Sequence, residues 1–287
     1  MYDLSYIKGW IMQIELNEIA DGIFALIPEF AIRFNCNIGI ILEDDGITLV
    51  DTGGTASVVA PLLRHLEAFN RPVKRVILTH GLGDHTCGAS KFSSADIYCS
   101  PDCAASLKAP QMTGFLKALH PSIAHELEDV IHPAPSVLVE DEIQIGSRLS
   151  LQKLIGHTKG DLIVRVDDAD LVFAGDLCFF GHKPLGLGAD FSAWRSSLDT
   201  IKGLNLRHVS PGHGPIGGHS EIDMVASYLD ALLEAKSADH LSLDQTWSKW
   251  FDPWDERISG AIDRINIETL RNPGSVPPTL FQLMSES

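Results

Sequence analysis

Seven polar residues lie where predicted strands end, each beside a glycine, threonine or proline of a turn. They are Asp51, His80, Asp84, His85, His157, Asp176 and His213. Imidazole and carboxylate groups together suit Zn²⁺, with Fe and Mn as alternatives. Loops at strand ends can aim such groups at one point while the sheets behind them stay rigid. The residue types and positions therefore predict a metal site.

Any single one of the 12 histidines is more often a structural residue than a ligand. What argues for a site is the order of five flanking contexts, namely DTGG, HGLGDH, GHTKGD, AGD and PGHGP. Taken together, over about residues 20–215, these contexts resemble the metallo-β-lactamase superfamily, in which HGLGDH stands where the family has H-x-H-x-D-H. The resemblance implies a four-layer αβ/βα sandwich of the α+β class and a metal-dependent hydrolase.

The resemblance also implies a role for each residue. His80 and His157 would belong to a first metal site, and Asp84, His85 and His213 to a second. Asp176 would bridge the two sites. Asp51 would not bind metal but would steady the ligand loop by hydrogen bonding.

One position departs from the family pattern. Leu82 stands where the family has its second histidine, and its side chain has no lone pair to offer a metal. The first site would then keep three protein ligands and the second all four, so we expect one tightly bound ion and a weaker or absent second one. His182 could supply the missing donor, but we interpret it as a surface-loop histidine and do not count it as a ligand.

The expected chemistry is hydrolysis. A metal lowers the pKa of bound water from about 15.7 towards 7, which gives a metal-bound hydroxide at neutral pH. Asp84 or Asp176 would act as the catalytic carboxylate that orients the water and takes its proton. The sequence thus predicts a zinc enzyme with one or two ions that cleaves a small-molecule ester, lactone, thioester or amide.

Two other functions stay open at this point. An iron-dependent oxidoreductase could use the same donors. A partly degenerate metal-binding pseudoenzyme would be consistent with Leu82, although the retention of five other donors argues against it. Neither a Ser/His/Asp triad context nor a phosphate-binding glycine loop competes with these hypotheses.

The elements that must position these residues follow from periodicity. Strands are predicted at residues 22–29, 37–44 and 46–53, the last two joined by a turn at Asp45-Gly46. A helix from Thr55 to Phe69 and a strand at 73–79 follow. Residues 101–135 read as a helical lid. A second β-layer is expected from strands at 136–146, 147–156, 161–166 and 171–176, followed by a helix at 192–204 and a strand at 207–210.

Composition limits the remaining possibilities. The 287 residues are 45% hydrophobic and contain no linker, which predicts one domain over 1–287, with a core at about 20–215 and a C-terminal helical extension at about 219–287. The net charge of −16 disfavours nucleic acid as a partner. The amino terminus resembles neither a signal peptide nor a membrane span, so we expect a cytoplasmic protein with a small-molecule substrate and no membrane partner. The run WSKWFDPW is interpreted as a C-terminal helix packed on the core, with a homodimer contact as the second choice.

Five cysteines are an odd number, and none of their spacings matches a zinc knuckle or a CxxC motif. We interpret most of them as buried, reduced thiols. Cys87 and Cys178 each lie two residues beyond a proposed ligand, so they are the cysteines with a chance of contacting the site.

Overall fold

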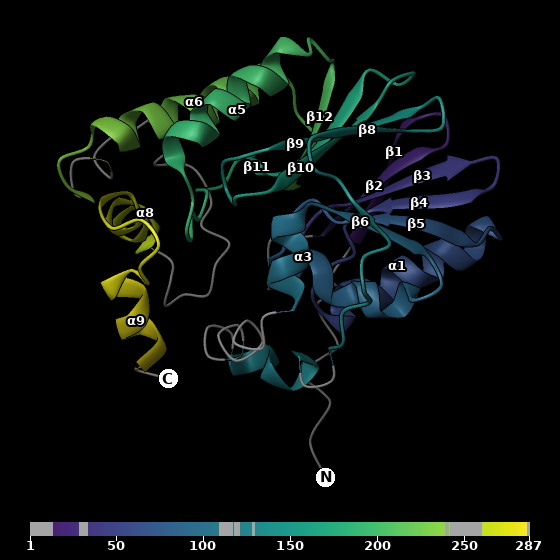
Figure 1. Ribbon diagram of the computed structural model, residues 1–287, viewed down its shortest axis with the longest axis horizontal. Helices are drawn as coiled ribbons and strands as arrows, with labels where there is room; N and C mark the ends of the chain where they lie inside the picture. The colour runs from purple at the N-terminus through teal and green to yellow at the C-terminus, as the bar shows by residue number, and fades with distance from the viewer. Residues whose placement is uncertain are drawn as a thin grey trace.

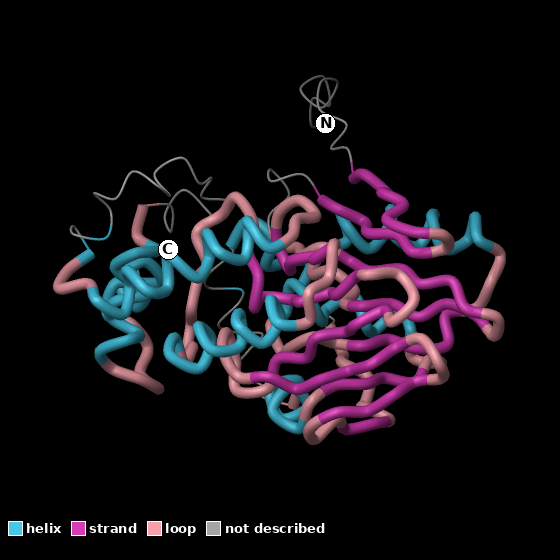
Figure 2. Tube along the Cα trace, turned by 90° about the horizontal axis from the view of Figure 1, so that it is seen from above, coloured by secondary structure: helices cyan, strands magenta, loops and turns pink. Residues whose placement is uncertain are grey.

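Two β-sheets face each other, and helices cover both outer faces (Figures 1 and 2). The structure is a computed structural model, and it describes residues 14–28, 34–108, 117, 121–127, 130–238, 241 and 260–285. The predicted four-layer αβ/βα sandwich is confirmed. Among the helices in these ranges, none is both long and apolar enough to cross a lipid bilayer.

The first sheet has seven strands in chain order: β1 (Ile14–Ala20), β2 (Ile23–Pro28), β3 (Ile38–Glu43), β4 (Gly46–Val50), β5 (Val73–Ile77), β6 (Asp96–Cys99) and β7 (Val137–Leu138). The pairs from β1 to β4 are antiparallel, and those from β4 to β7 are parallel. Helix α1 (Ala56–Phe69) makes the crossover that the parallel pair β4–β5 requires. It buries Val58, Leu62 and Leu66, and it ends at Asn70, whose φ is 51°.

The second sheet has the order β12 (His208–His213), β11 (Leu171–Phe179), β10 (Asp161–Val166), β9 (Leu149–Leu154) and β8 (Glu142–Ile145). Helices α5 (Phe191–Gly203) and α6 (His219–Glu234) cover its outer face (Figure 1). Every residue of β11 is buried, which explains why its sequence runs apolar instead of alternating.

Apolar side chains from both sheets form the core between them, including Val50 and Ile77 from the first and Val164 and Phe173 from the second. The sheets approach closely at Gly39, where a Cβ would lie 2.6 Å from the Phe173 ring. A larger residue there would force the layers apart, and the interior is packed too densely to absorb such a shift cheaply.

Short elements complete the described chain. They are α2 (Gly83–Thr86), the 3₁₀ helix Cys87–Phe92, α3 (Pro101–Leu107), the 3₁₀ helix Pro121–Leu127, α8 (Ile262–Arg271) and α9 (Pro278–Ser285). Within the predicted lid at 101–135, the described helices are therefore short. The run WSKWFDPW, predicted to be a helix, lies outside the described residues.

The structure differs from two local predictions. The β3–β4 turn is Asp44-Asp45, one residue earlier than predicted, and Gly46 pairs with Glu43 as the first residue of β4. Gly46 is needed there because a Cβ would lie 2.6 Å from the Pro72 carbonyl oxygen. The segment 136–146, predicted as one strand of the second layer, is divided between the sheets, with β7 in the first and β8 in the second.

Candidate metal centre

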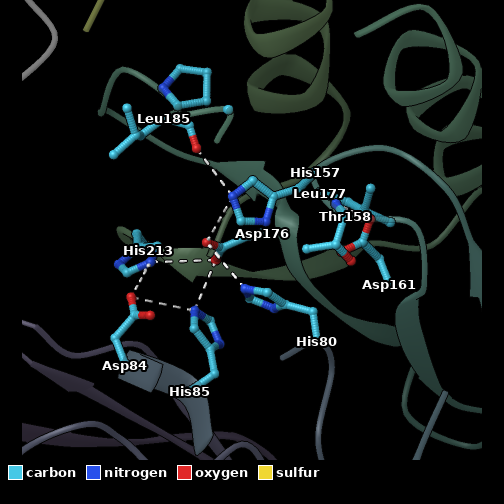
Figure 3. A network of polar contacts seen from close by, with 12 residues as sticks. His80, Asp84, His85, His157, Thr158, Asp161, Asp176, Leu177, Leu185 and His213 are labelled. Atoms are coloured by element: carbon cyan, nitrogen blue, oxygen red, sulfur yellow. Dashed lines mark hydrogen bonds and ion pairs between the residues drawn. The ribbon is translucent and has the colours of Figure 1, made fainter. Parts of the chain in front are cut away.

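The six predicted ligands meet where the ends of both sheets come together (Figure 3). The first sheet contributes a loop and a short helix after β5, which carry His80, Asp84 and His85. The second sheet contributes His157 between β9 and β10, Asp176 in β11 and His213 at the end of β12. The structure thus brings together residues that are up to 133 positions apart (80 to 213). Their role as metal ligands stays a prediction.

Asp176 does not end its strand as predicted. It lies inside β11, where the pairing with β12 shifts register around Gly175, a residue with φ of 52°. The next strand leaves room for its carboxylate because Gly212 has no side chain, and a Cβ at Gly212 would lie 1.9 Å from Asp176 Oδ1. Gly175 of AGD is therefore required by its backbone conformation, and Gly212 of PGHGP is required by the close approach of the Asp176 carboxylate.

The carboxylate of Asp176 faces two pairs of histidines, one with each oxygen (Figure 3). Oδ1 lies 3.1 Å from His85 Nε2 and 3.4 Å from His213 Nε2. Oδ2 lies 3.7 Å from His80 Nε2 and 3.8 Å from His157 Nε2. The family resemblance implies that Asp176 bridges two metal ions, and this role stays a prediction.

Asp84 completes one of these two groups. Its Oδ2 lies 3.4 Å from His213 Nε2 and 3.8 Å from His85 Nε2. The ligand atoms of Asp84, His85 and His213 all lie within 4.8 Å of one another, as do those of His80, His85 and Asp176. The first group, with Asp176, offers two imidazoles and two carboxylates, a donor set that suits zinc.

Several of these buried atoms make no hydrogen bond within the described part of the chain. They are His80 Nε2, His85 Nε2 and Asp176 Oδ1, on residues that are 0%, 0% and 2% exposed. A buried polar atom without a partner costs about 1–3 kcal/mol. Three such atoms within 4.8 Å of one another are expected where cations compensate the cost, so the residues fit a metal centre.

Burial and neighbouring charges shift the pKa values of the residues at this site. Burial lowers the pKa of His80 well below its ordinary value, so this imidazole is neutral. Burial alone would also lower the pKa of His213, but Asp176 and Asp84 raise it to about 9. Burial opposes ionisation of Asp176, yet His213 and the other histidines hold its pKa well below the usual range. The carboxylate is therefore charged and available as a ligand.

Asp51 makes hydrogen bonds to the loop that carries His80 and His85, as the family resemblance implies. Its Oδ1 accepts a hydrogen bond from the Thr79 backbone N–H at 2.8 Å, and its Oδ2 accepts one from the Thr79 hydroxyl at 2.8 Å. The residue has a φ of 62°, a left-handed conformation that Asp tolerates better than most side chains. These bonds tie the end of β4 to the loop that carries His80 and His85.

Leu82 precedes α2 at its N-cap position and is partly exposed. His182, predicted to lie in a surface loop, is instead 1% exposed, and that prediction was wrong. It lies beside the His213 loop, where a Cβ on Gly214 would be 3.1 Å from His182 Cδ2. No group of candidate metal ligands among the described residues includes His182.

Sequence reasoning missed two residues near the site. The possible ligand atoms of Cys36, Asp51 and His85 lie within 4.8 Å of one another, although the sequence favours Cys87 and Cys178 as the cysteines near the site. Burial raises the pKa of the Cys36 thiol to about 12. Asp161 has a carboxylate oxygen within 4.8 Å of ring nitrogens of His80 and His157. It accepts hydrogen bonds from the Thr158 backbone N–H at 2.9 Å and from the Thr158 hydroxyl at 2.7 Å. The Thr-x-x-Asp spacing could have indicated this turn, but nothing in the sequence marks Cys36.

Sequence comparison identifies relatives of this chain. A family model described as the metallo-beta-lactamase superfamily matches residues 31–213. A Mycobacterium bovis protein described as uncharacterized is 29% identical over 194 residues, covering 62% of this chain and 86% of its own length. A beta-lactamase-like protein 2 homolog of Caenorhabditis elegans is 25% identical over 188 residues, covering 65% of this chain and 56% of its own length.

Solved structures share the fold. A metallo-beta-lactamase family protein from Thermus thermophilus superposes with a TM-score of 0.66 and 20% identity, covering 91% of this chain and 98% of its own. The metallo-beta-lactamase FIM-1 of Pseudomonas aeruginosa, in its mono-zinc form, superposes with a TM-score of 0.59 and 15% identity, covering 76% of this chain and 95% of its own. Since the family model spans residues 31–213, which include all six candidate ligands and more than half of the chain, this protein belongs to the metallo-β-lactamase superfamily.

Proposed function

We propose that this protein is a metal-dependent hydrolase of a small-molecule ester, lactone, thioester or amide. The observation that carries the proposal is the carboxylate of Asp176, whose Oδ1 faces His85 and His213 while its Oδ2 faces His80 and His157. Such a carboxylate, buried and without a hydrogen bond at Oδ1, is suited to hold a divalent ion.

Asp84, His85, Asp176 and His213 would hold the first ion, with zinc preferred and iron or manganese as alternatives. When bound, the metal would lower the pKa of a coordinated water towards neutrality and polarise the carbonyl of the substrate. His80 and His157, on the other oxygen of Asp176, would hold a second ion more weakly, because Leu82 supplies no donor beside them.

Asp84 is the proposed proton acceptor. Burial would raise its pKa, but His85 and His213 outweigh burial and keep the pKa below the ordinary value, so the side chain is ionised at neutral pH. An ionised carboxylate beside the attacking water can orient it and take its proton. His80 is neutral, so in the metal-free protein the positive charge of the site lies on His85 and His213, whose pKa values are raised by the nearby carboxylates.

We also propose that the protein works in the reducing cytoplasm. All five cysteines are buried and free, and none is paired in a disulfide. This fits a compartment in which thiols stay reduced.

The test combines metal analysis with a substrate panel. The protein is purified without added metal, its metal content is measured, and an aryl ester, a lactone, a thioester and a β-lactam are assayed. We expect hydrolysis of at least one class, with kcat lowered by at least about 100-fold in Asp84→Asn. The exposed Asp96→Asn serves as the matched control and should keep full activity. A metal-loaded protein that cleaves none of these bonds and instead shows iron-dependent redox activity would overturn the proposal.

A further inference from the structure

One buried amide in the C-terminal helix α8 fixes the backbone on both sides of Leu185. Asn266 is 0% exposed. Its amide nitrogen donates to the Pro184 carbonyl at 2.8 Å, and its side-chain oxygen accepts from the Gly186 backbone N–H at 2.9 Å. Two bonds that bracket a single residue leave the peptide of Leu185 little freedom to turn.

The carbonyl of Leu185 lies 3.1 Å from His157 Nε2, close enough for a hydrogen bond (Figure 3). A carbonyl oxygen can only accept, so Nε2 must carry the proton of this bond. The same Nε2 faces Asp176 Oδ2 at 3.8 Å. A protonated Nε2 has no lone pair for a metal, so this hydrogen bond and a metal–nitrogen bond at Nε2 exclude each other.

Further contacts of α8 hold the same loop. The Lys183 ammonium pairs with Asp263 at 2.6 Å, and the Tyr228 hydroxyl donates to Asp263 at 2.9 Å. The side chain of Leu185 is 3% exposed and packs with Ile262, Ile265 and Leu280 of the two C-terminal helices. These helices lie outside the stretch 31–213 that the family model matches.

We propose that Asn266 is a positioning residue through which α8 holds the Leu185 carbonyl on His157 Nε2, and that this bond weakens metal binding at the His80/His157 side of Asp176. The inference rests on the proposed function because it concerns the same site. The missing donor at Leu82 and the hydrogen-bonded Nε2 of His157 then both lower the metal affinity of the His80/His157 side. The protein binds one ion tightly, between Asp84, His85, Asp176 and His213.

The experiment uses the full-length protein in two states. In the metal-free protein, nitrogen-15 NMR of labelled histidines reports the tautomer of His157, whose resonance is assigned by its loss in His157→Gln. We expect the Nε2–H tautomer with a slowly exchanging proton. In Asn266→Ala the same proton should exchange faster, because the Leu185 peptide is no longer held.

A zinc titration by calorimetry then measures the affinity of the protein for a second zinc ion. Loss of one competing hydrogen bond should tighten the second zinc site by about three- to tenfold in Asn266→Ala, with the first site unchanged. Thr269→Ala is the matched control, since Thr269 is a buried polar residue of the same helix, 1% exposed, whose hydroxyl makes no hydrogen bond within the described residues. If Asn266→Ala fails to fold, Asn266→Asp keeps the size of the side chain and the acceptor for Gly186 but loses the amide donor.

Three results would overturn the inference. One is an Nδ1–H tautomer of His157 in the metal-free wild type. Another is a second-site affinity that stays the same in the folded Asn266 variants, or that changes equally in Thr269→Ala. The third is a wild type that binds two zinc ions with equal affinity. Failure of the proposed function gives another result, namely a protein that binds no metal or cleaves no substrate. The tautomer of His157 can still be measured in such a protein.

Discussion

Asp51 accepts a hydrogen bond from His85 Nδ1 at 2.8 Å, and both side chains are buried. The bond fixes the ring so that Nε2 lies 3.1 Å from Asp176 Oδ1. Burial opposes protonation of His85, but Cys36, Asp176 and Asp51 raise its pKa well above the ordinary value, so the metal-free ring carries a proton on both nitrogens. A carboxylate behind a histidine ligand fixes the ring orientation and raises the basicity of the ligand. Asp51 therefore orients the candidate nitrogen donor of His85, and a metal bound there would have to displace the proton of Nε2.

Replacing this carboxylate should weaken metal binding without unfolding the protein. We expect Asp51→Asn to lower zinc affinity by about 10–100-fold, measured by competition with a chromophoric chelator. Asn tolerates the left-handed φ of 62°, so the backbone is not strained. Thr79→Val is the control, because it removes the hydroxyl contacts to Asp51 and to His80 Nδ1 but leaves the bond between Asp51 and His85 intact. An equal loss in both variants would show that loop stability, and not the His85 bond, controls affinity.

Removal of the metal should abolish hydrolysis and lower the melting temperature. One ion would hold candidate ligands from distant segments together, and binding to the native state alone would add about 2.7 kcal/mol to the free energy of unfolding when the metal is at 100 times its Kd. Differential scanning calorimetry with and without chelator measures the effect. His213→Ala should melt at the same temperature in both conditions. A wild type that is equally active and equally stable after dialysis against chelator would contradict the prediction.

The two sides of Asp176 should differ in metal affinity. Asp84→Ala or His213→Ala removes a ligand from the group of four and should empty the tight site. His80→Ala removes a candidate ligand from the side that already lacks a donor at Leu82, so it should lower the metal content less than Asp84→Ala or His213→Ala does. Elemental analysis of the purified variants decides the point. Loss of all metal in His80→Ala, together with full metal in His213→Ala, would reverse the assignment.

A histidine at position 82 should complete the weaker side. Leu82 lies at the start of α2, two residues after His80, and is partly exposed. Leu82→His should add a nitrogen donor at about 2.0–2.1 Å from zinc and raise the metal content by up to one equivalent per chain. Leu82→Ala controls for the loss of the apolar side chain. If the wild type already binds two equivalents tightly and the substitution changes nothing, another group supplies the missing donor.

Zinc affinity should rise with pH below about 9. Burial opposes protonation of His213, but Asp176 and Asp84 raise its pKa to about 9, so this imidazole carries a proton at neutral pH in the metal-free protein. A metal must displace that proton, and each displaced proton makes the apparent affinity rise about tenfold per pH unit below the pKa. Calorimetry in two buffers of different ionisation enthalpy counts the protons released. An affinity that is constant between about pH 7 and 9 would contradict this assignment of charge.

The sequence alone determined the local features of this protein. The helix from Thr55 to Phe69 and the strands that flank it follow from apolar periodicity, which is a property of neighbouring residues. The candidate ligands could be predicted because short motifs carry them, and in some of these motifs the structure requires the glycine. Gly212 shows this directly, since a Cβ there would meet the carboxylate of Asp176.

Tertiary structure decided what depends on packing between distant segments. Nothing near His182 in the sequence indicates that it is buried, and nothing near Cys36 indicates that it meets His85. The division of residues 136–146 between the two sheets depends on pairings that local periodicity does not encode. The contact between His157 and Leu185 is made by a backbone carbonyl, a group that every residue has, so no residue type can mark it. Asn266 holds that carbonyl in place from 80 residues beyond Gly186, and only the packing of α8 against the loop brings the two together.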